Sequence, residues 1–167
     1  MNTKQNNTLN LSKKLIINLP VFMETAVKTL TAFTDLKARK LGHSIKKLDK
    51  SVEEEVINAV MRFNGDIKGS FVLIFPIDIA VMAMESLLGE EIDRTDIETL
   101  KDGVGEFCNI ITGSIKTALV DKGIEITFAL PRKYISMSST SADIGKNNGV
   151  WVDMQLAEQN FYMFVCS

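Results

Sequence analysis

The longest regular pattern of hydrophobic and polar positions lies in the second half of the chain. Between residues 96 and 122, apolar side chains recur every three or four positions, which is the spacing of one face of an α-helix. Thr95 and Glu98 have the spacing of a capping box, in which each side chain accepts a hydrogen bond from the other residue's backbone N–H. Gly123 favours a left-handed stop at the other end. The pattern therefore predicts a helix of about 40 Å over this range.

Shorter patterns predict two further helices and six strands. Pro20 and Pro76 each suit the first turn of a helix, where the N–H that proline lacks would have no partner, and Gly89 would end the second helix. Strands are indicated by alternating or continuously apolar runs between turn-forming residues. The helices are expected at about residues 19–34 and 76–88, and the strands at about 38–48, 56–63, 70–75, 124–130, 150–156 and 161–166.

The connections between these elements favour an α+β fold. The last two strands are joined by the short polar turn 157–160, which favours antiparallel pairing. Residues 136–148 are rich in Ser, Asn and Gly and are expected to form a loop. We predict long helices packed on a twisted, mainly antiparallel sheet of about six strands. Residues 1–14 are expected to be a flexible polar tail, and residues 15–167 a single domain.

Composition narrows the classes of function. Hydrophobic side chains make up 46% of the 167 residues and charged ones 24%, which is enough apolar material for a buried core. The formal net charge is −2, and the only basic stretch is 37–50, so we expect no nucleic-acid partner. The N-terminus lacks the apolar segment of a signal peptide, and no stretch resembles a membrane span of about 18 apolar residues. We therefore expect a cytoplasmic protein without membrane contact.

The long predicted helix has an unusual polar side. When residues 96–122 are projected at about 100° per residue, one side is apolar and forms the expected core stripe. Gly103, Gly105 and Gly113 each cost about 1 kcal/mol relative to alanine in a helix. Without their side chains, another backbone or a partner's loop could approach closely. The residues expected on the opposite, solvent-facing side are Asp102, Gly105, Glu106, Asn109, Thr112, Gly113 and Lys116.

Glu106 and Asn109 on this side could act together on one target. Residues three positions apart on a helix are neighbours, so the carboxylate and the carboxamide would point in the same direction. A carboxamide both donates and accepts hydrogen bonds and can hold a water in line with a phosphorus atom. A carboxylate can pair with a lysine of a partner. Spacing alone does not distinguish this pair from the solvated side of an ordinary amphipathic helix.

Other catalytic arrangements find little support in the sequence. His43 is the only histidine, and it lies in a lysine-rich segment where we expect it to be exposed. Cys108 falls on the core stripe without a neighbouring base, so we expect it to be a small buried hydrophobe. Cys108 and Cys166 lack metal-ligand spacing, and the chain has no phosphate-binding glycine loop. We expect this chain to bind no metal or cofactor itself.

The segment 102–119 resembles the signature helix of the CheC/CheX/FliY chemotaxis phosphatases. That family's pattern is an acidic or small polar residue, then E-x-x-N, two apolar residues, a small residue, Gly and a nearby Lys. The turn that begins at Gly65, the helix that closes at Gly89 and the strand that ends in Pro131 are similar too, so the resemblance covers about residues 55–135. The residues that match the signature are Asp102, Glu106, Asn109, Gly113 and Lys116.

The number of motif copies indicates which branch of the family the chain resembles. The family has one layout with two copies and one with a single copy. The first predicted helix offers Glu24, but Val27 stands three residues later, so only one copy is present. This resembles the CheX layout, whose members form homodimers through their sheets. The apolar strand 161–166 could supply such an edge pairing, and burial within the monomer explains its composition equally well.

The resemblance implies a reaction and a distribution of roles. Proteins of this type remove the phosphoryl group from the aspartate of a CheY-like receiver domain. Asn109 would position the attacking water, and Glu106 would dock on the receiver's active-site lysine. The Mg²⁺ would be held by the phosphorylated partner rather than by this chain. The alternative is a non-catalytic CheX-like module that binds a response regulator or a flagellar-switch component. The partner-binding residues would be Asp102, Gly105, Thr112, Gly113 and Lys116.

Overall fold

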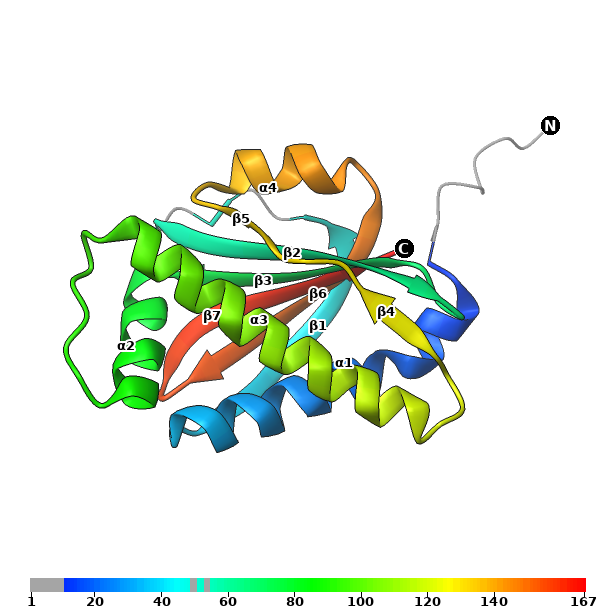
Figure 1. Cartoon of the computed structure of the whole chain (residues 1–167). Helices are drawn as coiled ribbons and strands as arrows, with labels where there is room; N and C mark the ends of the chain where they lie inside the picture. Colours follow the sequence, from blue (N-terminus) through cyan, green and yellow to red (C-terminus); the bar gives the residue numbers. More distant parts are fainter. Residues whose placement is uncertain (1–10, 49–50, 53–54) are drawn as a thin grey trace.

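The computed structural model describes residues 11–48, 51–52 and 55–167. Helices and strands alternate irregularly along the chain (Figure 1). Within the described residues, the helices are α1 (Lys13–Thr34), α2 (Ile77–Leu88), α3 (Ile97–Val120) and α4 (Met137–Ile144). The strands are β1 (Ala38–Lys47), β2 (Val56–Gly65), β3 (Gly69–Pro76), β4 (Ile126–Phe128), β5 (Arg132–Tyr134), β6 (Asn148–Leu156) and β7 (Gln159–Cys166).

The strands form one sheet in which every pairing is antiparallel. Their order is β1-β6-β7-β3-β2-β4, and β5 also pairs with β2. The predicted α+β fold is confirmed, with a sheet of seven strands in the described residues rather than about six. The difference arises because only the middle of the predicted strand 124–130 pairs with β2, and a separate short strand follows it.

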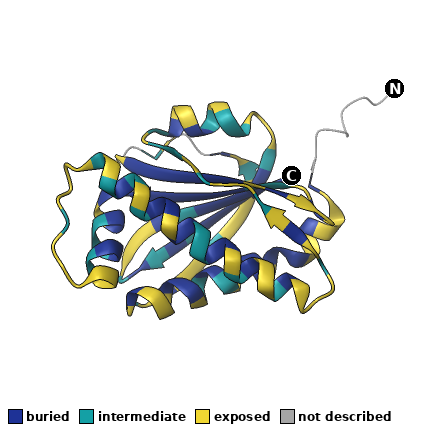
Figure 2. Ribbon diagram, in the orientation of Figure 1, coloured by how far each residue is buried: buried dark blue, intermediate teal, exposed yellow. Residues whose placement is uncertain are grey.

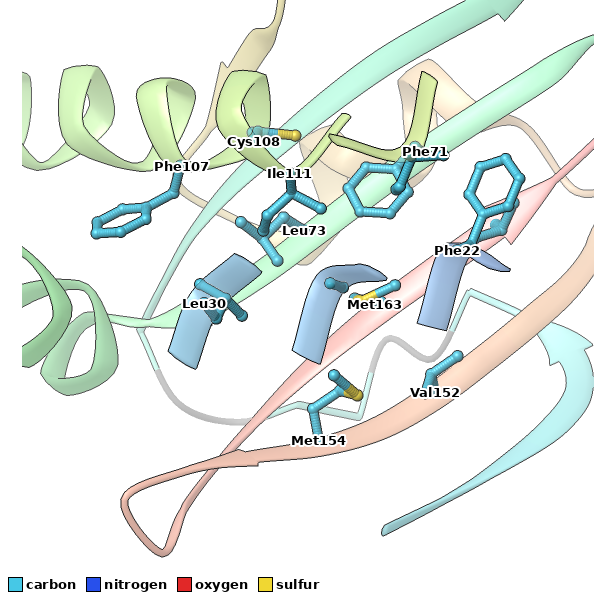
Figure 3. Packing of buried hydrophobic residues seen from close by; sticks show 14 of the residues in the cluster. Phe22, Leu30, Phe71, Leu73, Phe107, Cys108, Ile111, Val152, Met154 and Met163 are labelled. Atoms are coloured by element: carbon cyan, nitrogen blue, oxygen red, sulfur yellow. The ribbon is translucent and has the colours of Figure 1, made fainter. Parts of the chain in front are cut away.

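Two hydrophobic clusters hold helices on opposite faces of this sheet. Helices α1, α2 and α3 cover what we call the three-helix face, and α4 lies on the other, the α4 face (Figures 1 and 2). The larger cluster joins Phe22 of α1 and Phe107 of α3 to sheet residues such as Phe71 (Figure 3). The smaller cluster joins Met137 of α4 to the sheet residue Trp151. Burial of this apolar surface is the main force that holds the layers together.

Helix α1 begins earlier than its proline suggested. Ser12 caps it by accepting a hydrogen bond from the N–H of Leu15 at 3.2 Å, so Pro20 lies inside the helix rather than in its first turn. Residues 13 and 14 of the predicted polar tail are the first residues of α1, and residues 1–10 of that tail lie outside the described residues.

Helix α1 is also the one described helix whose length and composition would allow it to cross a membrane. The expectation that no segment has such a composition is therefore wrong. Of the apolar stretch, 44% is buried within the protein, and Leu15, Phe22 and Leu30 belong to the larger core cluster. Packing against the sheet accounts for the apolar character of this helix.

The ends of α2 and α3 test the predicted helix signals. Helix α2 follows Pro76 and ends at Gly89, whose φ of 70° is left-handed, as predicted. Helix α3 is capped by Asp96, which accepts from the N–H of Thr99 at 3.2 Å. The predicted capping box is wrong, because the Thr95 hydroxyl instead donates to Asp93 at 2.7 Å.

The predicted loop 136–148 contains a helix. Ser136 caps α4 by accepting from the N–H of Ser139 at 3.1 Å, so a serine-rich segment that resembles a loop supplies a helix start. Asp143 then ties α4 to the sheet, because its carboxylate accepts hydrogen bonds from Arg132 and from the Tyr134 hydroxyl, both at 2.6 Å.

Strand β7 is an interior strand. It pairs with β6 on one side and with β3 on the other, and its turn from β6 needs only Ala157 and Glu158, both with positive φ. Burial within the monomer therefore explains its apolar composition, and it offers no free edge to a second copy. The ends of the sheet order are β1 and β4.

Candidate functional site

Helix α3 lies across the three-helix face of the sheet and presents two different sides. The predicted core stripe is confirmed for most of its members, and Figure 3 shows Phe107, Cys108 and Ile111 directed toward the sheet. Ile97 and Ala118, which were expected in the stripe, are only half-buried. The stripe residues buried along α3 are Leu100, Val104, Phe107, Cys108, Ile111, Ile115 and Leu119.

Glu106 and Asn109 lie away from this core. Glu106 is exposed, and Asn109 is half-buried one turn further along. Asp102 and Lys116 are exposed on the same helix, so four of the predicted polar residues follow one another along its outer side. The spacing of a helix thus places a carboxylate and a carboxamide where a partner can reach both.

Two residues predicted for the exposed side are buried instead. The Thr112 hydroxyl donates to the carbonyl of Cys108 at 2.8 Å and lies 3.4 Å from the sulfur of Met61 in β2. Gly105 is covered by side chains of the β5 segment. The projection failed here because α3 contacts β4 and β5 as well as β2, so its buried surface is wider than one stripe.

The three glycines of α3 have different surroundings. A Cβ on Gly103 would overlap the side chain of Met84 in α2. A Cβ on Gly105 would lie 3.0 Å from Cδ of Lys133 and 3.7 Å from Cγ of Pro131. Packing within the protein therefore explains both residues. Only Gly113, with nothing within 4 Å, leaves open surface on which a partner could approach the helix closely.

A β-bulge sets which side chains reach α3 from the sheet. Phe63 of β2 pairs with Phe128 and Val60 pairs with Arg132, so the three residues 129–131 oppose only two on β2. An extra residue reverses the alternation of side chains along a strand. Phe128 accordingly packs on the three-helix face, whereas Arg132 reaches Asp143 on the α4 face.

The bulge turns Lys133 toward α3. Lys133 pairs with Ala59, a residue of the larger core cluster, and its methylenes pass over Gly105. Its Nζ lies 3.3 Å from Oδ1 of Asp102, with the lysine side chain 30% exposed and the aspartate 77% exposed. The sequence did not indicate Lys133 as a site residue, because Lys133 stands outside the signature and the direction of its side chain depends on the bulge. The only signal was Pro131, which a regular interior strand does not tolerate.

The site offers few side chains that could act as a nucleophile, base or metal ligand without a partner. Burial raises the pKa of the Cys108 thiol well above its ordinary value, which keeps it protonated. His43 is exposed on β1, a strand at the opposite end of the sheet order from β4. Among the described residues, no group of three or more His, Cys, Asp or Glu is placed to hold a metal ion. A carboxylate and a carboxamide can orient a water and a partner's cation, which is useful where the partner supplies the reactive group.

Comparisons with known proteins give the family and the fold of the chain. The family model described as chemotaxis phosphatase CheX matches residues 57–155, more than half of the chain. No curated protein gives a significant match. A CheC-like superfamily protein from Shewanella sp. PV-4 has a TM-score of 0.73 and 21% identity, covering 89% of this chain and 96% of that one.

Two further solved structures are similar over most of their length. A chain of the CheX–CheY–BeF3–Mg²⁺ complex from Borrelia burgdorferi has a TM-score of 0.70 and 20% identity, covering 89% of this chain and 96% of that one. FliY from Thermotoga maritima has a TM-score of 0.70 and 17% identity, covering 95% of this chain and 93% of that one. At these identities the structures establish the fold, and the family model carries the assignment. The chain belongs to the CheX family of chemotaxis phosphatases.

Proposed function

We propose that this protein hydrolyses the aspartyl-phosphate of a CheY-like receiver domain in the cytoplasm. The observation that carries the proposal is the pair formed by Glu106 and Asn109, which lie one turn apart on the outer side of α3. Membership of a phosphatase family supports the reaction. The similar chain from Borrelia burgdorferi, which was crystallised with CheY, BeF3 and Mg²⁺, supports a receiver domain as the partner.

Asn109 acts on the water in this proposal. Its carboxamide can accept a hydrogen bond from the water and donate one to a phosphoryl oxygen, which would align the water with the phosphorus atom. The new bond joins the water oxygen to phosphorus, and the bond from phosphorus to the aspartate oxygen breaks. The products are inorganic phosphate and a free carboxylate. Half-burial restricts the rotamers of Asn109, which favours a fixed position for the water.

Glu106 sets the docking geometry. Its exposed carboxylate would form a charge-assisted hydrogen bond with the lysine of the receiver's active site. The partner would hold the Mg²⁺, which neutralises charge on the transferring phosphoryl group. Gly113 and Lys116 would lie at the rim of the contact, where open surface and a positive charge favour close approach to an acidic site. We assign no partner contact to Thr112 or Gly105, since both are buried.

The test is phosphate release from purified receiver domains of the same organism, charged with acetyl phosphate in the presence of Mg²⁺. Wild type should accelerate release from at least one receiver. N109A should lose about 100-fold or more of that acceleration, because a positioning group is removed, while it retains binding to the beryllofluoride-activated receiver. E106Q should weaken binding instead. The matched control is E98Q, which neutralises an exposed carboxylate on the same helix that pairs with Lys101.

Each result of this experiment has a defined reading. Binding without acceleration by wild type would favour the non-catalytic CheX-like module, a binding partner of a response regulator or a flagellar-switch component. Full activity of N109A would leave the reaction in place and remove Asn109 from the site. Loss of activity in E98Q equal to that in E106Q would mean that overall charge, rather than a specific contact, governs docking.

We also propose that two copies associate through α1. Ile16 and Ile17 are 41% and 74% exposed on this helix. Ile16 borders a hollow of about 600 Å³ between α1 and β1 that is lined mainly by apolar side chains. Strand β1 ends the sheet but carries four basic residues, which oppose direct pairing of two β1 edges. Apolar contact between the α1 helices is therefore the preferred arrangement.

A further inference from the structure

The outer side of α3 carries two carboxylates that a partner's lysine could select. Asp102 and Glu106 are four residues apart, and both are exposed. Residues with this spacing lie next to each other on one side of a helix. An ammonium group bound at Asp102 rather than at Glu106 would move the docked receiver by about 6 Å, or slightly more than one turn, away from Asn109. A water held by Asn109 could not then reach the phosphorus atom.

The structure differentiates these two carboxylates. Asp102 already has a cation, because Nζ of Lys133 lies 3.3 Å from its Oδ1. Glu106 takes part in no ion pair with the described residues. An exposed ion pair of this kind adds little to stability. The ion pair has a larger effect on the charge of this surface. Lys133 neutralises Asp102, whereas Glu106 stays available to a cation of the partner.

Backbone features rather than a flexible side chain alone hold Lys133 in this position. The bulge at 129–131 directs Lys133 to the three-helix face, and Ala59 across the strand pair leaves space beneath it. Gly105 lets the lysine methylenes cross the helix, since a Cβ there would lie 3.0 Å from Cδ of Lys133. The ammonium group therefore reaches Asp102, one turn before Glu106.

We propose that Lys133 is a positioning residue that sets the docking register of the receiver by occupying Asp102. This proposal rests on the proposed function. Lys133 touches neither the water nor the phosphoryl group in this scheme. It acts through Asp102, so that the receiver's lysine finds a free carboxylate only at Glu106. The phosphorylated aspartate is then presented to Asn109.

The kinetic signature of this role differs from that of a structural ion pair. In K133Q, Asp102 becomes a second docking point, and a fraction of the receiver binds one turn away in an unproductive register. Unproductive binding lowers kcat and KM by the same factor and leaves kcat/KM unchanged. We expect a factor of about two to five, because the two carboxylates are similar and each exposed pair is weak. Local damage to the site would instead lower kcat/KM.

The experiment measures steady-state phosphate release and binding of the beryllofluoride-activated receiver for a set of variants. Removing the second carboxylate in K133Q/D102N should raise both constants again, and K133R should behave as wild type because it keeps a cation at Asp102. K101Q is the matched control, since it removes the charge of a half-buried lysine on α3, one residue before Asp102, that pairs with Glu98. It should reproduce neither effect. A fall in kcat/KM in K133Q, unchanged constants, or no recovery in K133Q/D102N would overturn the proposal.

Binding separates this proposal from the proposed function. K133Q should bind the beryllofluoride-activated receiver more tightly by the factor by which KM falls, and D102N in that background should abolish the gain. This comparison decides the role of Lys133 even if wild type binds the receiver without hydrolysing its phosphate, a result that would remove the enzyme proposal alone. If wild type neither binds nor dephosphorylates any receiver, both proposals are wrong.

Discussion

Gly103 of α3 lies so close to Met84 of α2 that no side chain fits between them. A Cβ at Gly103 would overlap the methionine side chain, which is 5% exposed and has little room to move. Close packing against Met84 therefore explains the glycine at position 103. The same contact joins α2 to the helix that carries Glu106 and Asn109. The contrast with Gly113, which has nothing within 4 Å, makes the two glycines a matched pair for experiment.

We predict opposite effects of alanine at these two positions. G103A should reduce the free energy of unfolding by about 1 kcal/mol, since overpacking costs about 1–3 kcal/mol and the gain in helix propensity returns about 1 kcal/mol. G113A should increase it by up to about 1 kcal/mol through propensity alone. Urea denaturation measures both. The loss in G103A should disappear in the M84A background, and its persistence there would mean that another contact excludes the methyl group.

The ionisation of Tyr134 should depend on Asp143. The Tyr134 hydroxyl donates to Oδ2 of Asp143 at 2.6 Å, and this hydrogen bond, burial and the negative charge of Asp143 together raise the pKa of the phenol. A raised pKa in the folded state contributes stability below the unfolded value of about 10, and this contribution is lost as the pH rises through the folded value. Wild type should therefore lose more stability than Y134F above about pH 10.

Tyrosinate absorbance isolates this effect in the Y162F background, since the chain has two tyrosines. D143N should lower the pKa of Tyr134 toward its ordinary value, because the amide cannot supply the negative charge. An unchanged titration midpoint in D143N would show that burial alone controls the phenol. The two arginines that contact Asp143, Arg62 and Arg132, remain in both proteins.

The cysteines should be unreactive in the folded protein. Burial raises the pKa of Cys166 to about 11 and that of Cys108 further, so neither forms the thiolate that attacks alkylating reagents at neutral pH. Mass spectrometry after iodoacetamide treatment at pH 7 should find no modification without denaturant and two modifications with it. Rapid modification of Cys108 in the native protein would contradict its place in the core and reopen the question of a thiol at the site.

The long hydrophobic pattern of α3 was predicted correctly, because the same side of the helix packs on the protein core at every turn. The stripe from Leu100 to Leu119 satisfies one geometric rule over many turns, so single exceptions do not disturb it. The prediction of a loop at 136–148 was wrong. Helix α4 is held by its Ser136 cap and by the contacts of Asp143 with the sheet, and neither is visible as a hydrophobic period. The serine-rich composition therefore resembled a loop.

The residues on the outer side of α3 were predicted only in part, because local spacing does not show which strands contact the helix. The signature indicates Glu106 and Asn109 from local spacing, and both lie away from the core as expected. Thr112 was misplaced because β2 contacts the helix from a direction that a single-helix projection does not include. The direction of the Lys133 side chain depends on the bulge at 129–131, which lies outside the signature helix. A one-residue change in register reverses the face on which a strand side chain lies.

The proposed dimer gives a final prediction. I17K should convert a dimer to monomers, because a charge would replace an apolar side chain that is 74% exposed in the monomer and buried in the proposed contact. Stability of the monomer should change by less than about 0.5 kcal/mol, since the position is exposed and lysine is a good helix former. L88K is the control, as Leu88 is 53% exposed on α2, outside the proposed contact. Light scattering after size exclusion measures the mass of each. A monomeric wild type at about 100 μM, or dissociation by L88K instead, would exclude association through α1, since even weak specific contacts populate dimers at that concentration.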